Sequence, residues 1–155
     1  MKHRVFAAFI ALVLGRARAA PGWAGAAGEG TTSVVAVIVH PENPVPRLGP
    51  AELRSIYTNN ILRWADGTPI KLYDLVVDSR ARGVFSEKVL GRPAYEVDEE
   101  WARLKITNQA ANPPLTVKSE RDIIRKVSRE KGAIGYVSLY LVKGNKDVRI
   151  IATLY

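Results

Sequence analysis

The sequence predicts an α/β fold in which a mixed sheet is flanked by helices. Apolar runs of strand length occur at 33–39, 69–77, 133–142 and 148–154, and their β-branched and aliphatic residues are typical of buried strands. The segments between these runs carry apolar residues at helical spacing and are bounded by Ser, Gly and Pro. Strands that alternate with helices favour a sheet covered by helices over an all-helical or all-strand domain.

The N-terminus has the organisation of a secretory signal peptide. Two basic residues precede an apolar run, 5–14, which is shorter than the roughly 20 residues that a bilayer span needs. An Ala-x-Ala cleavage site then ends at Ala19. We therefore expect residues 1–19 to be removed on export. Cleavage after Ala26, or retention of the segment as a membrane anchor, are the alternatives.

The rest of the chain divides into a leader and one domain. Residues 20–32 are small and rich in glycine, which predicts a flexible leader, and residues 33–155 are enough to form one core. Removal of 1–19 lowers the net charge from +8 to +4, with 19 basic and 15 acidic residues left. This mild basicity favours anionic ligands, and the lack of Lys/Arg clusters argues against a nucleic-acid partner.

The residue types that are missing exclude several kinds of site. Cysteine is absent, and His40 is the only histidine after residue 19. Disulfides, thiol catalysis and metal sites built from thiolates or several histidines are therefore excluded. The chain has no Gly-x-Ser-x-Gly elbow, no phosphate-cradling Gly-x-x-x-x-Gly-Lys loop and no His-Glu-x-x-His motif. We expect an exported binding protein with no metal and no cofactor, and not an enzyme.

The first half of the domain is expected to contain two strands and one helix. The strand at 33–39 ends at 40–46, where three prolines cannot join a strand ladder or a helix interior. Pro50 suits the first position of a helix, because its fixed φ matches that position. The apolar residues on one face of this helix are Leu53, Ile56 and Tyr57. The second strand is expected at 69–77.

Two further helices are expected in the middle of the domain. Ser79 is a good N-cap for a helix that ends before Gly91. Another helix covers 95–105, and the acidic run at 96–100 suits the positive end of its dipole. The residues of this helix that face inward are Trp101 and Leu104.

The last third of the domain is expected to contain one helix and two strands. A polar loop spans 108–114, and Ser119 with Asp122 forms a capping box at the start of a helix that Gly132 ends. The strands at 133–142 and 148–154 complete the order β-α-β-α-α-α-β-β.

The start of the helix after Ser79 is a candidate anion site. An N-cap serine leaves the amides of Arg80, Ala81 and Arg82 at the helix start, where the dipole favours negative charge. The serine hydroxyl can donate to an anion or accept from its own helix. Arg80 or Arg82 can add a bidentate contact to a tetrahedral oxyanion. The alternative interpretation is an ordinary capped helix with two solvated arginines.

Other residues are weaker candidates, because each has an ordinary structural role as its alternative. Thr107, Asn108 and Gln109 could line a cleft, or they are polar loop residues that face water. Asn43 could contact a ligand or form a turn. Trp64 and Trp101 could frame a groove or anchor the core, and His40 is expected to be a strand-end residue.

Five motifs, taken in order, carry a resemblance. They are His40-Pro-Glu-Asn-Pro44, Leu53-Arg-Ser-Ile-Tyr57, Trp64-Ala-Asp-Gly-Thr-Pro-Ile70, Asp78-Ser-Arg-Ala-Arg82 and Gly132-Ala-Ile-Gly-Tyr-Val137. On these motifs, residues 33–151 resemble the phosphate-binding proteins of bacterial ABC transporters, which have the type 2 periplasmic binding protein fold. That family reads Ser-Gly-Thr-Arg where this chain reads Ser79-Arg-Ala-Arg82, so one glycine and one hydroxyl are replaced.

The resemblance implies one lobe of a two-lobed binding protein that is located in the periplasm or otherwise exported. It implies phosphate or a similar oxyanion as the ligand, held by Ser79, Arg80, Ala81 and Arg82, and an ABC transporter permease or another envelope protein as the partner. A homodimer could supply the second wall of the site. One alternative is a protein-interaction module of the envelope that has the same fold and no ligand. Another is a binder of polyanions or membrane surfaces.

Overall fold

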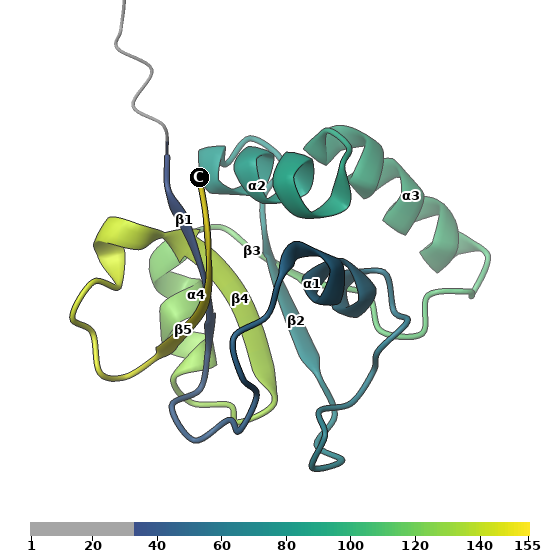
Figure 1. The fold of residues 1–155 in the computed structure, drawn as a ribbon. Coiled ribbons are helices and arrows are strands. Elements are labelled where there is room, and N and C mark those ends of the chain that lie inside the picture. Colours follow the sequence, from purple (N-terminus) through teal and green to yellow (C-terminus); the bar gives the residue numbers. More distant parts are fainter. Residues whose placement is uncertain (1–32) are drawn as a thin grey trace, which may run out of the picture. The chain divides into compact units, whose positions relative to one another are not determined.

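The computed structural model describes residues 33–155, and the predicted signal peptide and leader lie outside them. One five-stranded sheet, in the order β3-β2-β4-β1-β5, has helices on both faces (Figure 1). The elements are β1 (Val35–Val39), α1 (Pro50–Tyr57), β2 (Lys71–Leu75), α2 (Arg80–Phe85), the π-helix η1 (Ser86–Leu90), α3 (Ala94–Ile106), β3 (Leu115–Val117), α4 (Glu120–Val127), β4 (Ala133–Ser138), the 3-10 helix η2 (Leu139–Leu141) and β5 (Arg149–Leu154). The predicted mixed α/β fold is confirmed.

The sheet is mixed because β1 runs against its two neighbours. β1 pairs antiparallel with β4 and with β5, whereas β2 pairs parallel with β3 and β4. All five residues of β1 are fully buried, as a β-branched run without polar alternation predicts for a strand covered on both faces. The parallel strands β2, β3 and β4 therefore all end at the same edge of the sheet.

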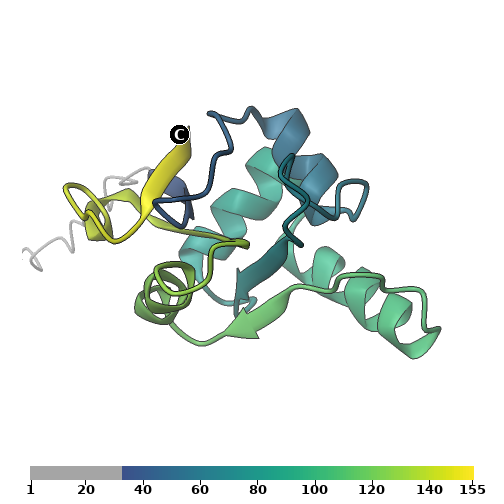
Figure 2. The same ribbon diagram turned by 90° about the horizontal axis from the view of Figure 1, so that it is seen from below.

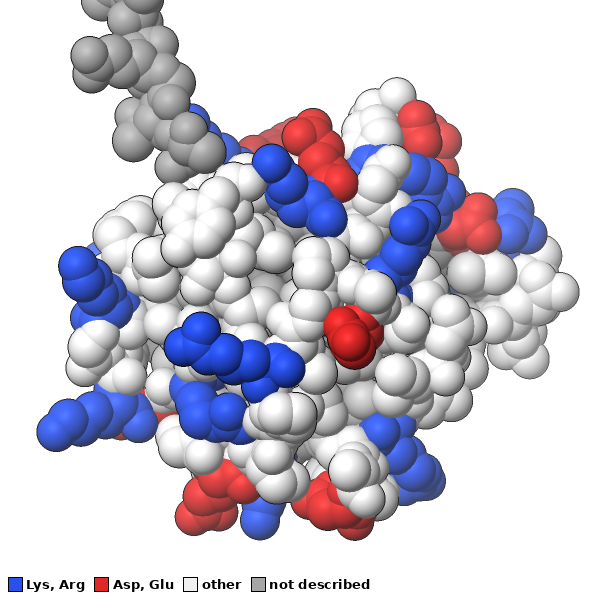
Figure 3. Space-filling view, in the orientation of Figure 1, with Lys and Arg blue, Asp and Glu red and all other residues white. Residues whose placement is uncertain are grey.

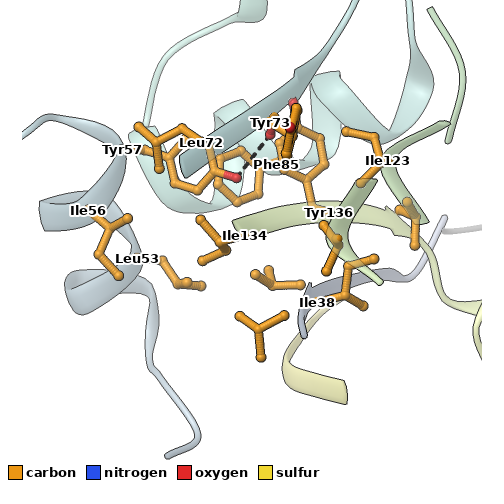
Figure 4. Close-up of a cluster of buried hydrophobic side chains, with 14 of the residues drawn as sticks. Ile38, Leu53, Ile56, Tyr57, Leu72, Tyr73, Phe85, Ile123, Ile134 and Tyr136 are labelled. Atoms are coloured by element: carbon orange, nitrogen blue, oxygen red, sulfur yellow. Dashed lines mark hydrogen bonds between the residues drawn. The ribbon is translucent and has the colours of Figure 1, made fainter. Parts of the chain in front are cut away.

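Adjacent residues of β4 show which helices cover which face. A Cβ on Gly135 would lie only 2.5 Å from Cγ2 of Ile123 in α4, whereas the ring of Tyr136 stacks on Phe85 of α2, with centroids 4.0 Å apart. Successive side chains of a strand point to opposite faces. Helix α4 thus covers one face, while α2 covers the other together with α1, whose Tyr57 ring lies 4.7 Å from Phe85 (Figure 4).

The view along the perpendicular direction shows the layers. In Figure 2, β2 lies between α4 and the α1–α2 layer, and α3 extends to the right, away from the sheet. Among residues 33–155, no helix combines the length and the apolar character that crossing a bilayer requires.

Three features of the local structure differ from what the sequence led us to expect. The strand expected at 133–142 ends at Ser138, because its partner β1 begins at Val35, the residue that faces Ser138, and the chain then turns into η2. The helix after Ser79 changes to π geometry at Ser86. Strand β3 was not predicted, because it has only three residues and follows two prolines.

Candidate functional site

The ends of β2 and β3 bring two helix starts to one edge of the sheet. The amide of Val76 donates to the carbonyl of Val117 at 3.3 Å, so the strands still run side by side where their loops begin. α2 begins a few residues after β2 and α4 directly after β3, and these helices cover opposite faces of the sheet. In open α/β sheets, ligands bind at such a switch point, outside the carboxyl ends of the strands.

Ser79 caps α2 as the sequence predicts. Its hydroxyl accepts from the amide of Arg82 at 3.5 Å, and its carbonyl accepts from the amide of Gly83 at 3.0 Å. The amide of Ala81, at the second helical position, has no carbonyl one turn earlier in the helix to receive it. Ser79 is half-buried, Arg80 is exposed and Ala81 is buried.

Arg82 is not a solvated clamp, because its guanidinium is buried between two carboxylates. The residue is only 1% exposed. One terminal nitrogen contacts Asp74 of β2, and the other lies 2.7 Å from Asp98 of α3. These contacts attach the first turn of α2 to β2 and α3. The guanidinium of Arg82 therefore binds carboxylates within the protein and is not exposed as an anion clamp.

The buried carboxylate of Asp74 has further partners. It accepts from the amide of Leu75 at 2.9 Å and from the hydroxyl of Tyr136. Burial raises the pKa of Tyr136, and the nearby Arg82 cation opposes that shift in part. Tyr136 is therefore a neutral hydrogen-bond donor to the carboxylate throughout the physiological pH range.

The second helix start was not recognised as part of the site from the sequence. Ser119 caps α4: its hydroxyl donates to Asp122 at 2.8 Å and accepts from the Asp122 amide at 3.1 Å. Lys118 precedes it and is exposed. The capping box was visible in the sequence, but the pairing of β2 with β3 that brings it to the same edge was not. Asp78, also exposed, adds a negative charge to this edge.

A large hollow lies beside this edge and is acidic. Its volume is about 600 Å³, and its charged lining residues are Asp74, Asp98, Glu99 and Lys105. Because three of these four groups are carboxylates, the hollow does not suit an inorganic anion. We therefore place the candidate anion site at the start of α2 and not in the hollow.

The weaker candidates have structural roles or face solvent. The side chain of Asn43 accepts from the amide of Val45 at 3.0 Å and donates to the carbonyl of Lys131 at 3.1 Å, and the indole N–H of Trp64 donates to the carbonyl of Gly132 at 3.0 Å. Trp101 is buried, and the ring of His40 accepts a hydrogen bond from the amide of Glu42. The remaining candidates are exposed: Thr107, Asn108 and Gln109.

No group of three or more His, Cys, Asp or Glu side chains within residues 33–155 is arranged to hold a metal ion.

Comparisons with known proteins agree with this fold. The sequence model of the PBP superfamily domain matches residues 31–150. No curated protein matches the sequence significantly. A solved structure with bound phosphate, described as a phosphate ABC transporter substrate-binding protein from Clostridium perfringens, matches with 25% identity and a TM-score of 0.60. It covers 77% of this chain, which in turn covers 45% of that protein.

Two other solved structures show the same fold at lower identity. An ABC-type phosphate transport receptor from Vibrio cholerae has 21% identity and a TM-score of 0.58, and PstS from Borrelia burgdorferi has 19% and 0.56. Each covers 77% of this chain, and the chain covers 46% and 47% of them, so it spans less than half the length of each of these proteins. The chain therefore belongs to the PBP superfamily, with a mixed α/β fold that matches about half of each of these phosphate-transport proteins.

Proposed function

We propose that this protein is a solute-binding module that binds an inorganic oxyanion, phosphate above all, without catalysis. The observation that carries the proposal is the position of two serine-capped helix starts, at Ser79 and Ser119, on one switch-point edge of the sheet. Helix starts attract anions through their amides and their dipoles. Membership of the PBP superfamily and the phosphate bound by a similar solved structure support the choice of ligand.

Each residue of the predicted site has a distinct role in this proposal. The hydroxyl of Ser79 and the amides of Arg80 and Ala81 donate to the anion, and the exposed guanidinium of Arg80 supplies the charge. Arg82 does not contact the anion. Its contacts with Asp74 and Asp98 hold the first turn of α2 in place, and this turn carries the other three residues of the predicted site. The glycine and the hydroxyl that the resemblance leads one to expect are replaced by Arg80 and Ala81, so we expect the anion to be held more by charge than by backbone.

The proposal extends to location and partners. Residues 1–19 act as a signal peptide, 20–32 as a leader and 33–155 as the binding domain of an exported protein. An envelope transporter permease receives the ligand. A second copy of the chain, packed against the edge that carries Ser79, would close the site and exclude water from it.

Melting curves with different anions test the proposed function. We expect phosphate to raise the melting temperature more than sulfate or chloride at matched ionic strength, because specific binding to the native state stabilises it. The Arg80→Gln variant should bind phosphate about tenfold more weakly, since one charge-assisted hydrogen bond is lost. Arg129→Gln, an exposed arginine beyond the far end of α4, is the matched control. Equal shifts with phosphate and chloride would contradict the proposal.

A further inference from the structure

A second cavity lies on the helical layer, between the end of α1, the end of η1 and α3. Its volume is about 150 Å³. The residues that line it are Arg54, Tyr57, Thr58, Leu90, Arg92, Val97, Glu100, Trp101 and Leu104. It contains none of the residues of the proposed anion site, so an inference from it does not depend on that site.

The floor of this cavity is apolar and aromatic. Tyr57, Leu90, Val97 and Trp101 are all at least nine-tenths buried. The hydroxyl of Tyr57 donates to the carbonyl of Tyr73 at 3.1 Å, so the polar end of this side chain is occupied and its ring forms the wall (Figure 4). A cavity of about 150 Å³ with such a lining has room for one benzene-sized ring, and aromatic walls favour an aromatic guest.

The rim carries more positive than negative charge. Among residues 33–155, Glu100 is paired with Arg103 at 2.7 Å, whereas no carboxylate is paired with Arg54 or Arg92. In Figure 3, basic side chains lie above α1, along its boundary with α2 and α3, with acidic side chains beside them. A guanidinium without a carboxylate partner is well suited to bind one from a ligand.

Both arginines line this cavity, and Arg54 lies close to the residue before Arg92. Gly91 has a positive φ of 71° and ends η1 next to Arg92. The terminal nitrogens of Arg54 lie 3.9 and 4.0 Å from where a Cβ on Gly91 would be. Arg54 thus lies within van der Waals distance of the turn that precedes Arg92.

We propose that this cavity binds a small aromatic carboxylate, with its ring on the floor and its carboxylate between Arg54 and Arg92. The ring provides the apolar contact that the floor requires, and the carboxylate matches the planar guanidiniums. An inorganic oxyanion meets only the second requirement, and a neutral aromatic molecule meets only the first. Benzoate is the simplest molecule that meets both.

An NMR titration of the whole chain with benzoate tests this proposal. The signal is the indole N–H of Trp101, which lines the cavity and is identified among the three tryptophans of the chain with a Trp101→Phe variant. We expect saturable shifts with a dissociation constant of about 1 mM, as ordinary contacts give for a ligand of this size. Acetate and benzyl alcohol, which each lack one half of benzoate, should bind at least about tenfold more weakly.

Variants at the rim separate specific binding from a general charge effect. Arg54→Gln and Arg92→Gln should each weaken benzoate binding about tenfold. Arg121→Gln, an exposed arginine in α4 on the opposite face of the sheet, should not weaken it. Melting curves check that each variant is folded, and either rim variant is sufficient for the test. Benzoate binding no tighter than that of acetate or benzyl alcohol, rim variants that bind as the original chain does, or displacement by equimolar phosphate would overturn the proposal.

Discussion

Arg82 is the residue for which the structure makes the most specific prediction. Its side chain is 2% exposed, and the side chains of its two partners, Asp74 and Asp98, are 6% and 50% exposed. Replacement of Arg82 by Met leaves the Asp74 carboxylate buried without a cation. Breaking a buried ion pair from one side costs about 3–5 kcal/mol, a large part of the roughly 5–15 kcal/mol that stabilises a typical domain.

The two carboxylates should respond very differently. Asp98→Asn removes a charge that solvent already screens, so we expect a loss of about 1 kcal/mol or less. Adding Asp74→Asn to Arg82→Met removes the uncompensated charge and keeps an acceptor for the Leu75 amide. That double variant should be more stable than Arg82→Met alone. In the original chain, by contrast, replacing Asp74 alone should lower the stability, because it breaks a native ion pair.

Urea unfolding followed by circular dichroism measures these differences. The midpoints should decrease in the order original chain, Asp98→Asn, Arg82→Met, with similar slopes, because a change in midpoint at constant slope reports a change in stability. A loss below about 1 kcal/mol for Arg82→Met, or a double variant less stable than Arg82→Met, would refute the burial argument. Arg82 would then be available as an anion clamp.

Three further predictions concern other parts of the molecule. A Cβ on Gly132 would lie 2.3 Å from the carbonyl oxygen of Pro69, whereas a Cβ on Gly83 would meet nothing within 4 Å. In urea unfolding, Gly132→Ala should therefore lower the stability by about 1–3 kcal/mol, and Gly83→Ala should not lower it. Equal effects of the two variants would contradict this. Asp78→Asn should tighten phosphate binding in calorimetry, because a negative charge leaves the edge, and weaker binding would argue against a site there. Burial raises the pKa of Tyr57 above its ordinary value of 10.0, so the native state holds the proton more tightly and stability should fall as the pH rises above about 10. Tyr57→Phe should show a smaller fall in the melting temperature over that range, and an unchanged pH dependence would contradict the assignment.

Features set by neighbouring residues were predictable from the sequence. The caps at Ser79 and Ser119 follow from local hydrogen bonding, and the buried strand β1 follows from its β-branched composition. The inward face of α1 follows from helical spacing, and its three predicted residues, Leu53, Ile56 and Tyr57, are buried.

Features set by distant residues were not predictable in this way. The acidic run at 96–100 suits a helix start, but nothing local shows that Asp98 pairs with Arg82, 16 residues earlier in the chain. β3 is too short to carry a pattern and exists because Leu115–Val117 pairs with β2. The position of Ser79 and Ser119 at the same edge of the sheet depends on the same pairing. The second half of the candidate site was therefore missed together with the strand.

The central claim is that an oxyanion binds at the start of α2, and amide NMR during a phosphate titration tests it most directly. We predict saturable shifts concentrated on the amides of Ser79, Arg80 and Ala81, with smaller ones at Ser119, and an equimolar chloride titration that leaves these amides unchanged. Shifts spread evenly over the basic side chains of the surface, or concentrated on residues of another part of the domain, would contradict the account.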